Sequence, residues 1–135
     1  MTSFLDPLLR KSSGDCVLVN QRTGAVLSDR LIPAFDSAAR RRGLLQHGEL
    51  PEGTAMIIAP SNAIHTFFMK FPIDVVFVGR DGAVRKIREA VAPWRMSAAL
   101  RAYAVIELRA GALRHANTVI GDTLVVRTPN RSALL

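Results

Sequence analysis

Hydrophobic residues occur along the chain in short runs separated by turn-forming residues, which is the pattern of β-strands. The predicted strands are Cys16 to Val19, Ala25 to Leu27, Ala55 to Ala59, His65 to Met69, Ile73 to Val78, Leu100 to Arg109 and Thr123 to Val126. Asp81-Gly82 predicts a hairpin turn, because this dipeptide adopts the positive φ angles that tight turns need. Val84, Ile87 and Val91 show helical spacing, but the turn before them favours a strand with a bulge over residues 83–91.

Helices are expected to be few and short. Pro33 interrupts the strand pattern, and Asp36 or Ser37 can cap a helix that continues to Arg42. Residues 4–9 and 112–117 each suit a single helical turn. Strands and helices do not alternate regularly, so a doubly wound parallel sheet is not expected. We therefore predict a mainly β protein, a compact antiparallel β-sandwich or barrel with one or two short helices.

The length of 135 residues is typical of one domain that folds without a disulfide or a metal. We divide the chain into an N-terminal extension (1–14), a single β domain (15–128) and a C-terminal tail (129–135). Residues 1–15 are too polar for a signal-peptide core, and no apolar run approaches the roughly 20 residues that span a bilayer. Cys16, the single cysteine, lies in an apolar run and is expected to be buried. We expect a monomeric cytoplasmic protein that does not bind membranes.

The chain is basic, with a net charge of +7, and the charge is uneven. Residues 80–114 hold eight basic and three acidic side chains, which gives this region a charge of +5. The arginines occur singly, and few aromatic residues lie between them to stack on bases. We therefore interpret the region as a solvated basic face and do not expect nucleic-acid binding. Weak binding of a polyanion through residues 80–114 is kept as an alternative.

Motifs that would identify a class of enzyme are absent from the sequence. There is no glycine-rich phosphate loop and no nucleophile elbow. His47, His65 and His115 lie far apart and lack the spacing of metal ligands. We therefore expect no metal and no cofactor.

Polar residues occur where burial is expected in the stretch His65–Val78. Asp74 lies within an apolar run, so its carboxylate needs donors such as backbone N–H groups, Lys70 or His65. We interpret Asp74 as a structural carboxylate that holds a turn or loop in place. The alternative is a general base whose pKa is raised by burial.

Glu107 alternates with Tyr103 and Arg109 on one side of a predicted strand. It is therefore expected to be solvated or paired with a neighbouring charge. An alternative function is a small hydrolase that uses Asp74 or Glu107 together with His65. That function requires these groups to converge within about 3 Å.

A dense cluster of aromatic and thioether side chains is formed by Phe67, Phe68, Met69 and Phe71. Strand alternation lets only part of this cluster enter the core, so one face could line a groove for an apolar ligand or a peptide. Trp94, in a proline-containing loop, is a binding anchor or a lid on the core. The candidate ligand-binding residues are His65, Phe68, Met69, Lys70, Asp74 and Glu107.

Several short segments occur in an order and spacing that match a known family. They are Arg42 to Leu45, Gly53 to Met56, Phe67 to Lys70, Ile73 to Phe77, Asp81-Gly82, Val105 to Leu108, Ala110-Gly111 and Gly121-Asp122. The chain resembles the Domain of Unknown Function 192 family of small bacterial and archaeal proteins over roughly residues 15–127. It departs from the family pattern at Phe68, where Trp is usual, and at Phe71-Pro72, where Asn-Thr is usual.

The resemblance implies a compact, largely β fold and no established activity. It also implies that a common role in the family is served by Met69-Lys70, Asp74, Glu107 and Asp122. That role is either a functional site or a requirement of folding. We therefore expect a non-enzymatic module that binds a ligand or a partner protein in a groove near His65–Asp74. On this hypothesis an Asp74→Ala protein folds but loses its partner.

Overall fold

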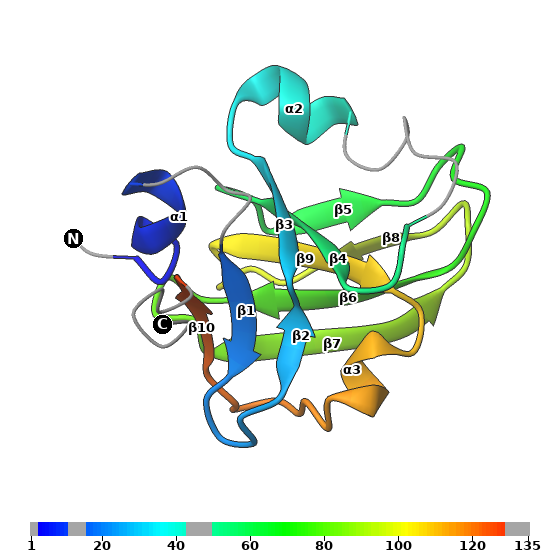
Figure 1. The fold of residues 1–135 in the computed structure, drawn as a ribbon. Coiled ribbons are helices and arrows are strands. Elements are labelled where there is room, and N and C mark those ends of the chain that lie inside the picture. The colour runs from blue at the N-terminus through cyan, green and yellow to red at the C-terminus, as the bar shows by residue number, and fades with distance from the viewer. Residues whose placement is uncertain (1–2, 11–15, 43–49, 129–135) are drawn as a thin grey trace.

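Three sheets form the body of the molecule, a computed structural model whose described residues are 3–10, 16–42 and 50–128 (Figure 1). The elements in chain order are α1 (Asp6–Arg10), β1 (Val17–Asn20), β2 (Val26–Ser28), β3 (Arg30–Ala34), α2 (Ser37–Arg42), β4 (Thr54–Ile58), β5 (Ala63–His65), β6 (Ile73–Val78), β7 (Val84–Val91), β8 (Met96–Ala98), β9 (Ala104–Arg109), α3 (Ala112–His115) and β10 (Leu124–Arg127). The fold is mainly β with short helices, as the sequence predicts. His47 and the predicted C-terminal tail lie outside the described residues.

The central sheet has five strands in the order β3-β4-β9-β6-β7. A three-stranded sheet, β10-β1-β2, and a two-stranded sheet, β5-β8, complete the fold. Neighbouring strands within these sheets are antiparallel, with the exception of β3 and β4. β7 is a strand with bulges rather than a helix, which confirms the prediction for residues 83–91.

β3 and β4 form a parallel pair connected through α2, a βαβ unit that the sequence pattern did not predict. Residues 30–34 were not expected to form a strand because Pro33 has no N–H to donate. Pro33 instead lies opposite Ile57 in β3, the edge strand, where one side of the backbone needs no partner. The predicted cap of α2 is present, since Asp36 Oδ1 accepts a hydrogen bond from Ala39 N at 2.7 Å.

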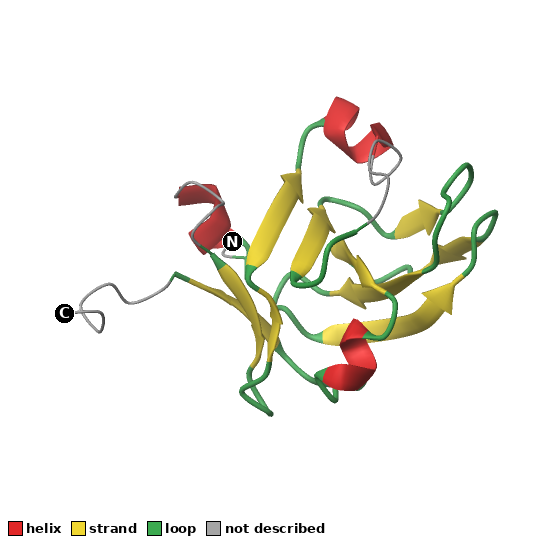
Figure 2. Ribbon diagram, turned by 45° about the vertical axis from the view of Figure 1, so that its right-hand side comes forward, coloured by secondary structure: helices red, strands yellow, loops and turns green. Residues whose placement is uncertain are grey.

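One hydrophobic core lies between the three-stranded sheet and the central sheet, which Figure 2 shows as two adjacent layers. Leu18 and Leu124 from the three-stranded sheet are clustered there with Ile57, Val76 and Ile106 from the central sheet. Burying side chains of this kind contributes roughly 1.5–3 kcal/mol each. This core therefore supplies much of the stability of the fold.

A second core covers the opposite face of the central sheet. Met56, Val75 and Val105 from that sheet cluster there with Ile64 of β5 and Met69. Because both faces of the sheet are covered, β6 is buried along its whole length and β9 along all but its last residue.

Two predicted strands are shorter than their hydrophobic patterns indicate. β9 begins at Ala104, and the chain before it forms a turn in which Leu100 is 91% exposed. β5 ends at His65, so the prediction of a strand over His65–Met69 is wrong beyond its first residue. β8, its partner strand, was not predicted.

Part of the predicted N-terminal extension is packed against the domain. Leu5, which precedes α1, and Leu8 within α1 are buried in the core between the sheets, and Phe4 N donates to Arg80 O at 2.9 Å. Within the described part of the chain, no helix is long and apolar enough to cross a membrane.

Candidate functional site

Asp74 is fully buried in β6, and its carboxylate accepts three backbone hydrogen bonds. Oδ1 accepts from Ala90 N at 2.8 Å, and Oδ2 accepts from Gly111 N at 3.0 Å and Leu113 N at 3.1 Å. Ala90 has a φ of 48° next to a bulge of β7, whereas Gly111 and Leu113 begin α3. Asp74 therefore fixes a bulge and a helix start, in agreement with its interpretation as a structural carboxylate.

Glu107 is buried in β9, and its Oε2 atom has no hydrogen-bond partner among the described residues. Burial raises the pKa of Glu107 to about 7. The expectation that this side chain is solvated or ion-paired is wrong, because β9 lies inside the central sheet with both faces covered. Burial of a carboxylate without a partner disfavours its charged form.

The two carboxylates lie on opposite faces of the central sheet. Glu107 is paired with Val75, so their side chains share a face, and Asp74 precedes Val75 and points the other way. The hydrogen bonds found for Asp74 in the described part of the chain go to backbone N–H groups and not to His65 or Lys70. Asp74 and Glu107 thus do not meet at a common centre with His65.

Asp122 organises the turn before β10. Its Oδ1 accepts from Arg22 Nε at 2.6 Å, and its Oδ2 accepts from Asn20 Nδ2 and Val119 N, each at 2.9 Å. The Arg22 guanidinium and these donors hold the pKa of Asp122 below its ordinary value. The network ties the β1–β2 hairpin to the segment that precedes β10, so its role is structural.

Thr66 joins the loop after β5 to the loop before β8. Its hydroxyl donates to Ala92 O at 2.7 Å and accepts from Arg95 N at 2.8 Å. Its backbone N donates to Arg95 O at 2.8 Å, and its backbone O accepts from Trp94 N at 3.0 Å. Because Thr66 is fully buried, these bonds hold the two loops together as one unit.

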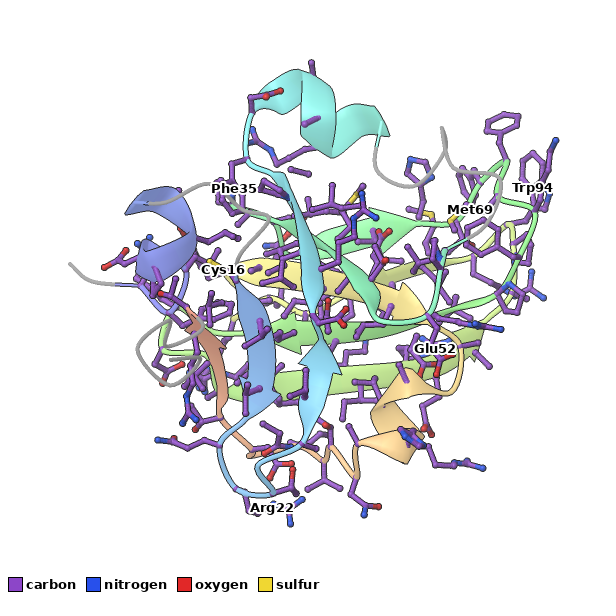
Figure 3. The ribbon with its side chains drawn as sticks, viewed as in Figure 1. Cys16, Arg22, Phe35, Glu52, Met69 and Trp94 are labelled. Carbon is purple, nitrogen blue, oxygen red and sulfur yellow. The ribbon has the colours of Figure 1, made fainter. Side chains whose placement is uncertain are left out.

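The joined loops present a group of aromatic and thioether side chains on the outside of the molecule. We call His65, Phe67, Phe68, Trp94 and Met96 the aromatic platform. The ring of Phe67 lies 4.9 Å from that of His65 and 5.7 Å from that of Trp94, and Phe68 meets Trp94 edge to face at 4.7 Å. Phe68 is 70% exposed, Trp94 56% and Met96 71%. Figure 3 shows Trp94 at the edge of the molecule, outside Met69.

The backbone is strained at two residues of the platform. Phe68 has a φ of 68° and Trp94 a φ of 66°, in the left-handed region that bulky residues rarely adopt. Each such residue costs of order 1–3 kcal/mol, so the surrounding hydrogen bonds must offset the strain. The fold therefore maintains these two aromatic residues in an exposed and unfavourable conformation.

The two loops that carry the platform contain basic side chains and no acidic ones. Lys70 lies exposed in the first loop and Arg95 in the second. Residues 61–72 and 92–101 contain no aspartate or glutamate. The platform is thus an apolar surface flanked by cations.

The structure brings together three of the six residues that the sequence selects as a binding site. His65, Phe68 and Lys70 lie at the exposed platform or beside it, and Met69 is buried beneath the same loop as part of the second core. Asp74 and Glu107 lie inside the sheet. Trp94 was recognised as an anchor or a lid, and its exposure favours the anchor. Met96 was missed, because only its pairing with His65 brings it to the platform.

A cavity of about 420 Å³ lies beside Phe71-Pro72, the two residues that directly precede β6 in the sequence. It is also lined by Leu50, Pro51, Arg109 and Ala110. None of the six residues that the sequence selects as ligand-binding lines this cavity. It is a separate feature from the platform, because the platform residues do not line it.

The basic residues of the region 80–114 are distributed over several elements. Arg80 stacks on the ring of Tyr103 at 4.2 Å, and Lys86 Nζ donates to Ala98 O at 2.7 Å. Others lie on β7, at the end of β9 and on α3. Several of these charges are thus engaged with neighbours in the fold.

No group of three or more histidine, cysteine, aspartate or glutamate side chains in the described ranges is close enough to hold a metal ion. Cys16 is buried at the start of β1.

The chain belongs to the DUF192 family, described as "Uncharacterized ACR", whose family model matches residues 19–126. This match confirms the resemblance read from the short segments, including Phe67 to Lys70 and Gly121-Asp122. A comparison with curated proteins finds no match.

Solved structures share the fold. A protein of unknown function from Novosphingobium aromaticivorans is 25% identical, with a TM-score of 0.69 and coverage of 81% of both chains. A protein from Sinorhizobium meliloti described as a "putative transcription regulator" is 21% identical, with a TM-score of 0.69 and coverage of 81% of this chain and 89% of that one. The second likeness concerns the fold alone.

Proposed function

We propose that this protein is a non-enzymatic binding module that holds an apolar segment of a partner protein on the aromatic platform. The observation that carries this proposal is the pair Phe68 and Trp94. Both rings are more than half exposed and touch each other, and both residues have left-handed backbone angles. Strain of this kind at exposed aromatic residues favours a role in binding, because packing of the core does not require it.

The chemistry of the platform favours a segment that contains both apolar and acidic residues. Aromatic side chains and Met are enriched at protein interfaces, where they form the central anchors. Lys70 and Arg95 flank these anchors without a nearby carboxylate in their own loops, so acidic residues of a partner would find complementary charge.

The hydrogen bonds of Thr66 prepare the platform for binding. Two loops that are already joined lose less conformational freedom on association than two independent loops. Met69 adds to this effect because it anchors the first loop in the second core. A rigid platform of this kind supports affinity with a small contact surface.

An acid–base function does not enter the proposal. Asp74 is held by three backbone N–H groups, and Glu107 points to the opposite face of the sheet. The Oε2 atom of the buried Glu107 has no hydrogen-bond partner among the described residues, and the hydrogen bond found for the exposed His65 side chain comes from Phe67 N. Neither carboxylate is therefore hydrogen-bonded to His65, as the hydrolase alternative requires.

A peptide-display selection tests the proposal. Random 12-residue peptides are selected on the folded protein, and the enriched peptides are synthesised and titrated against it. Trp94 is the single tryptophan of the chain, so its fluorescence reports directly on occupancy of the platform. We expect the enriched peptides to combine apolar and acidic residues and to shift the Trp94 emission to shorter wavelength.

Phe68→Ala should weaken binding of these peptides by about tenfold or more, as truncation of an interface anchor does. Ile120→Ala is the matched control, because Ile120 is also exposed but lies in the turn before β10. Phospholipid vesicles are titrated in parallel. Equal affinity of the Phe68→Ala protein for the peptides, or binding to vesicles without any enriched peptide, would contradict the proposal.

A further inference from the structure

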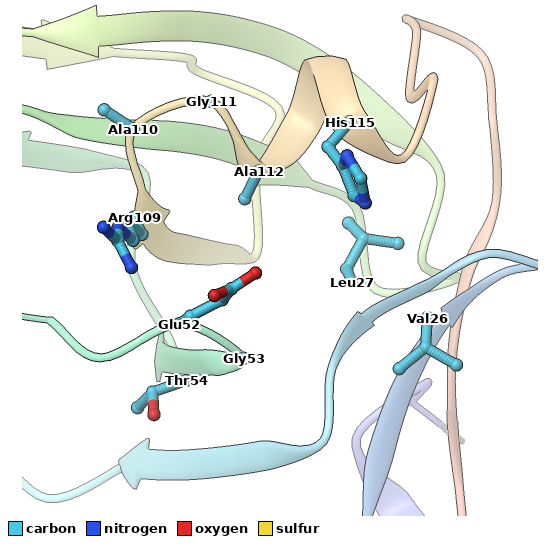
Figure 4. A pocket seen from close by; sticks show the side chains of 10 residues that line it. All are labelled: Val26, Leu27, Glu52, Gly53, Thr54, Arg109, Ala110, Gly111, Ala112 and His115. Atoms are coloured by element: carbon cyan, nitrogen blue, oxygen red, sulfur yellow. The ribbon is translucent and has the colours of Figure 1, made fainter.

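A second cavity lies between β2, the start of β4 and α3, and its volume is about 450 Å³ (Figure 4). This volume falls within the range of roughly 300–1,000 Å³ that is typical of small-molecule sites. The residues that line it do not include any member of the aromatic platform. It is therefore a separate candidate site.

Charged and titratable side chains from three parts of the chain line this cavity. Figure 4 shows Arg109 and Glu52 on one side and the imidazole of His115 across from them, near Leu27. The side-chain hydrogen bonds and ion pairs found within the described ranges do not involve Arg109, Glu52 or His115. Among the residues that the structure describes, these polar ends therefore have no competing partner for a molecule in the cavity.

Buried polar residues fix both walls of the cavity. On the α3 side, Asp74 accepts hydrogen bonds from Gly111 N and Leu113 N. On the β4 side, the buried Ser28 hydroxyl donates to Gly53 O at 2.7 Å. The backbone on both sides of the cavity is thus held by buried hydrogen bonds, so the shape of the cavity does not depend on exposed side chains alone.

Part of the remaining lining is aliphatic. Val26, Leu27 and Ala112 contribute aliphatic side chains to the lining. Gly111 has a φ of 96°, and no atom lies within 4 Å of the position that its Cβ would occupy. The space beside α3 is therefore accessible to an aliphatic group of a ligand.

We propose that this cavity binds a free α-amino acid with an aliphatic side chain. Arg109 would pair with the carboxylate in the bidentate geometry that guanidinium groups favour, and Glu52 would pair with the ammonium group. The aliphatic side chain would lie along Val26 and Leu27. A plain anion would be repelled by Glu52 and a plain cation by Arg109, so the pair of opposite charges selects a zwitterion.

Calorimetric titration with L-leucine, N-acetyl-L-leucine and L-leucinamide tests the assignment. N-acetyl-L-leucine keeps the carboxylate but lacks the ammonium group, and L-leucinamide has the reverse combination. We expect L-leucine to bind with a Kd below about 1 mM and the other two to bind at least about tenfold more weakly. Equal binding of N-acetyl-L-leucine, or no binding of L-leucine up to about 10 mM, would overturn the proposal.

Variants locate the binding. Arg109→Gln and Glu52→Gln should each weaken L-leucine binding by about tenfold or more, because each removes one charged contact. Arg101→Gln, which changes an exposed arginine in the turn after β8, should leave binding unchanged. Phe68→Ala should also leave it unchanged, so this site and the platform are tested independently. L-leucine binding that survives both Arg109→Gln and Glu52→Gln would place the ligand elsewhere and refute the assignment.

Discussion

Asp74 performs two structural tasks with one carboxylate. One oxygen satisfies the N–H of Ala90 next to the β7 bulge, and the other satisfies two N–H groups at the start of α3. A bulge leaves one residue outside the strand pairing, and a helix start leaves N–H groups without an intrahelical partner. The central sheet, its edge strand and α3 therefore depend on the same buried side chain.

Asp74→Asn should destabilise the protein strongly. The sequence analysis expected instead that a protein without this carboxylate still folds and loses only its partner. An amide keeps one acceptor oxygen but places an NH₂ group against a backbone N–H. We expect a loss of about 2–4 kcal/mol in the free energy of unfolding, measured by urea denaturation. Asp81→Asn is the control, since exposed Asp81 accepts from Ala83 N in a turn. A loss no larger than that of the control would contradict the structural role.

At the scale of elements, the platform loop illustrates how tertiary contacts override local preference. Phe67 and Phe68 are aromatic residues, which favour strands, so the sequence predicts a strand there. Thr66 instead bonds to the distant segment around Arg95, and the chain turns directly after His65. Because this hydrogen-bond partner is 29 residues away in the sequence, the residues around Thr66 do not indicate the turn.

The strain at Phe68 gives a prediction at this scale. Because φ is 68°, glycine should fit this position better than alanine, by about 1 kcal/mol in the free energy of unfolding. Urea denaturation of Phe68→Gly and Phe68→Ala measures the difference. At Phe67, which is not among the residues with positive φ, the order should be reversed. Equal stability of the two Phe68 variants would show that the left-handed angle carries no strain.

The course of β9 shows a different limit of sequence patterns. Glu107 and Arg109 alternate with apolar residues, which is typical of a strand with one solvated face. The strand lies in the middle of the central sheet, however, and only Arg109 at its end reaches the surface. The pattern predicted a strand that ends at Arg109 and the alternation of its two faces, although β9 begins only at Ala104. Its burial depends on strand order, which is not encoded in a local pattern.

For the whole molecule, the mainly β class followed from short apolar runs and turn residues. The candidate site was only partly predictable. His65, Phe68 and Lys70 are close in the sequence and were found, whereas Trp94 and Met96 join them only through the contacts of Thr66 and the pairing of β5 with β8. Sites assembled from two distant loops require the tertiary structure.

The stability of the whole protein should depend on pH through two carboxyl groups whose pKa values are shifted in opposite directions. The pKa of Asp122 is held below its ordinary value of 3.8, so its contribution is present above that pH and is lost as the pH falls. Burial raises the pKa of Glu107 from 4.5 to about 7, so its contribution is greatest below 4.5 and is lost as the pH rises through 7. Together they favour a maximum of stability near pH 4, with a decline on both sides.

Urea denaturation on both sides of this maximum, with one variant for each group, separates the two effects. Glu107→Gln has no proton to lose, so its stability relative to the wild type should rise by about 1–3 kcal/mol between about pH 5 and pH 8. Asp122→Asn should instead flatten the decline below about pH 4, at the cost of lower stability near neutral pH. Glu89→Gln, at a more exposed carboxylate near Arg114, should follow the wild type throughout. A Glu107→Gln curve parallel to that of the wild type would mean that Glu107 titrates as it does in the unfolded chain, in conflict with its burial inside the central sheet.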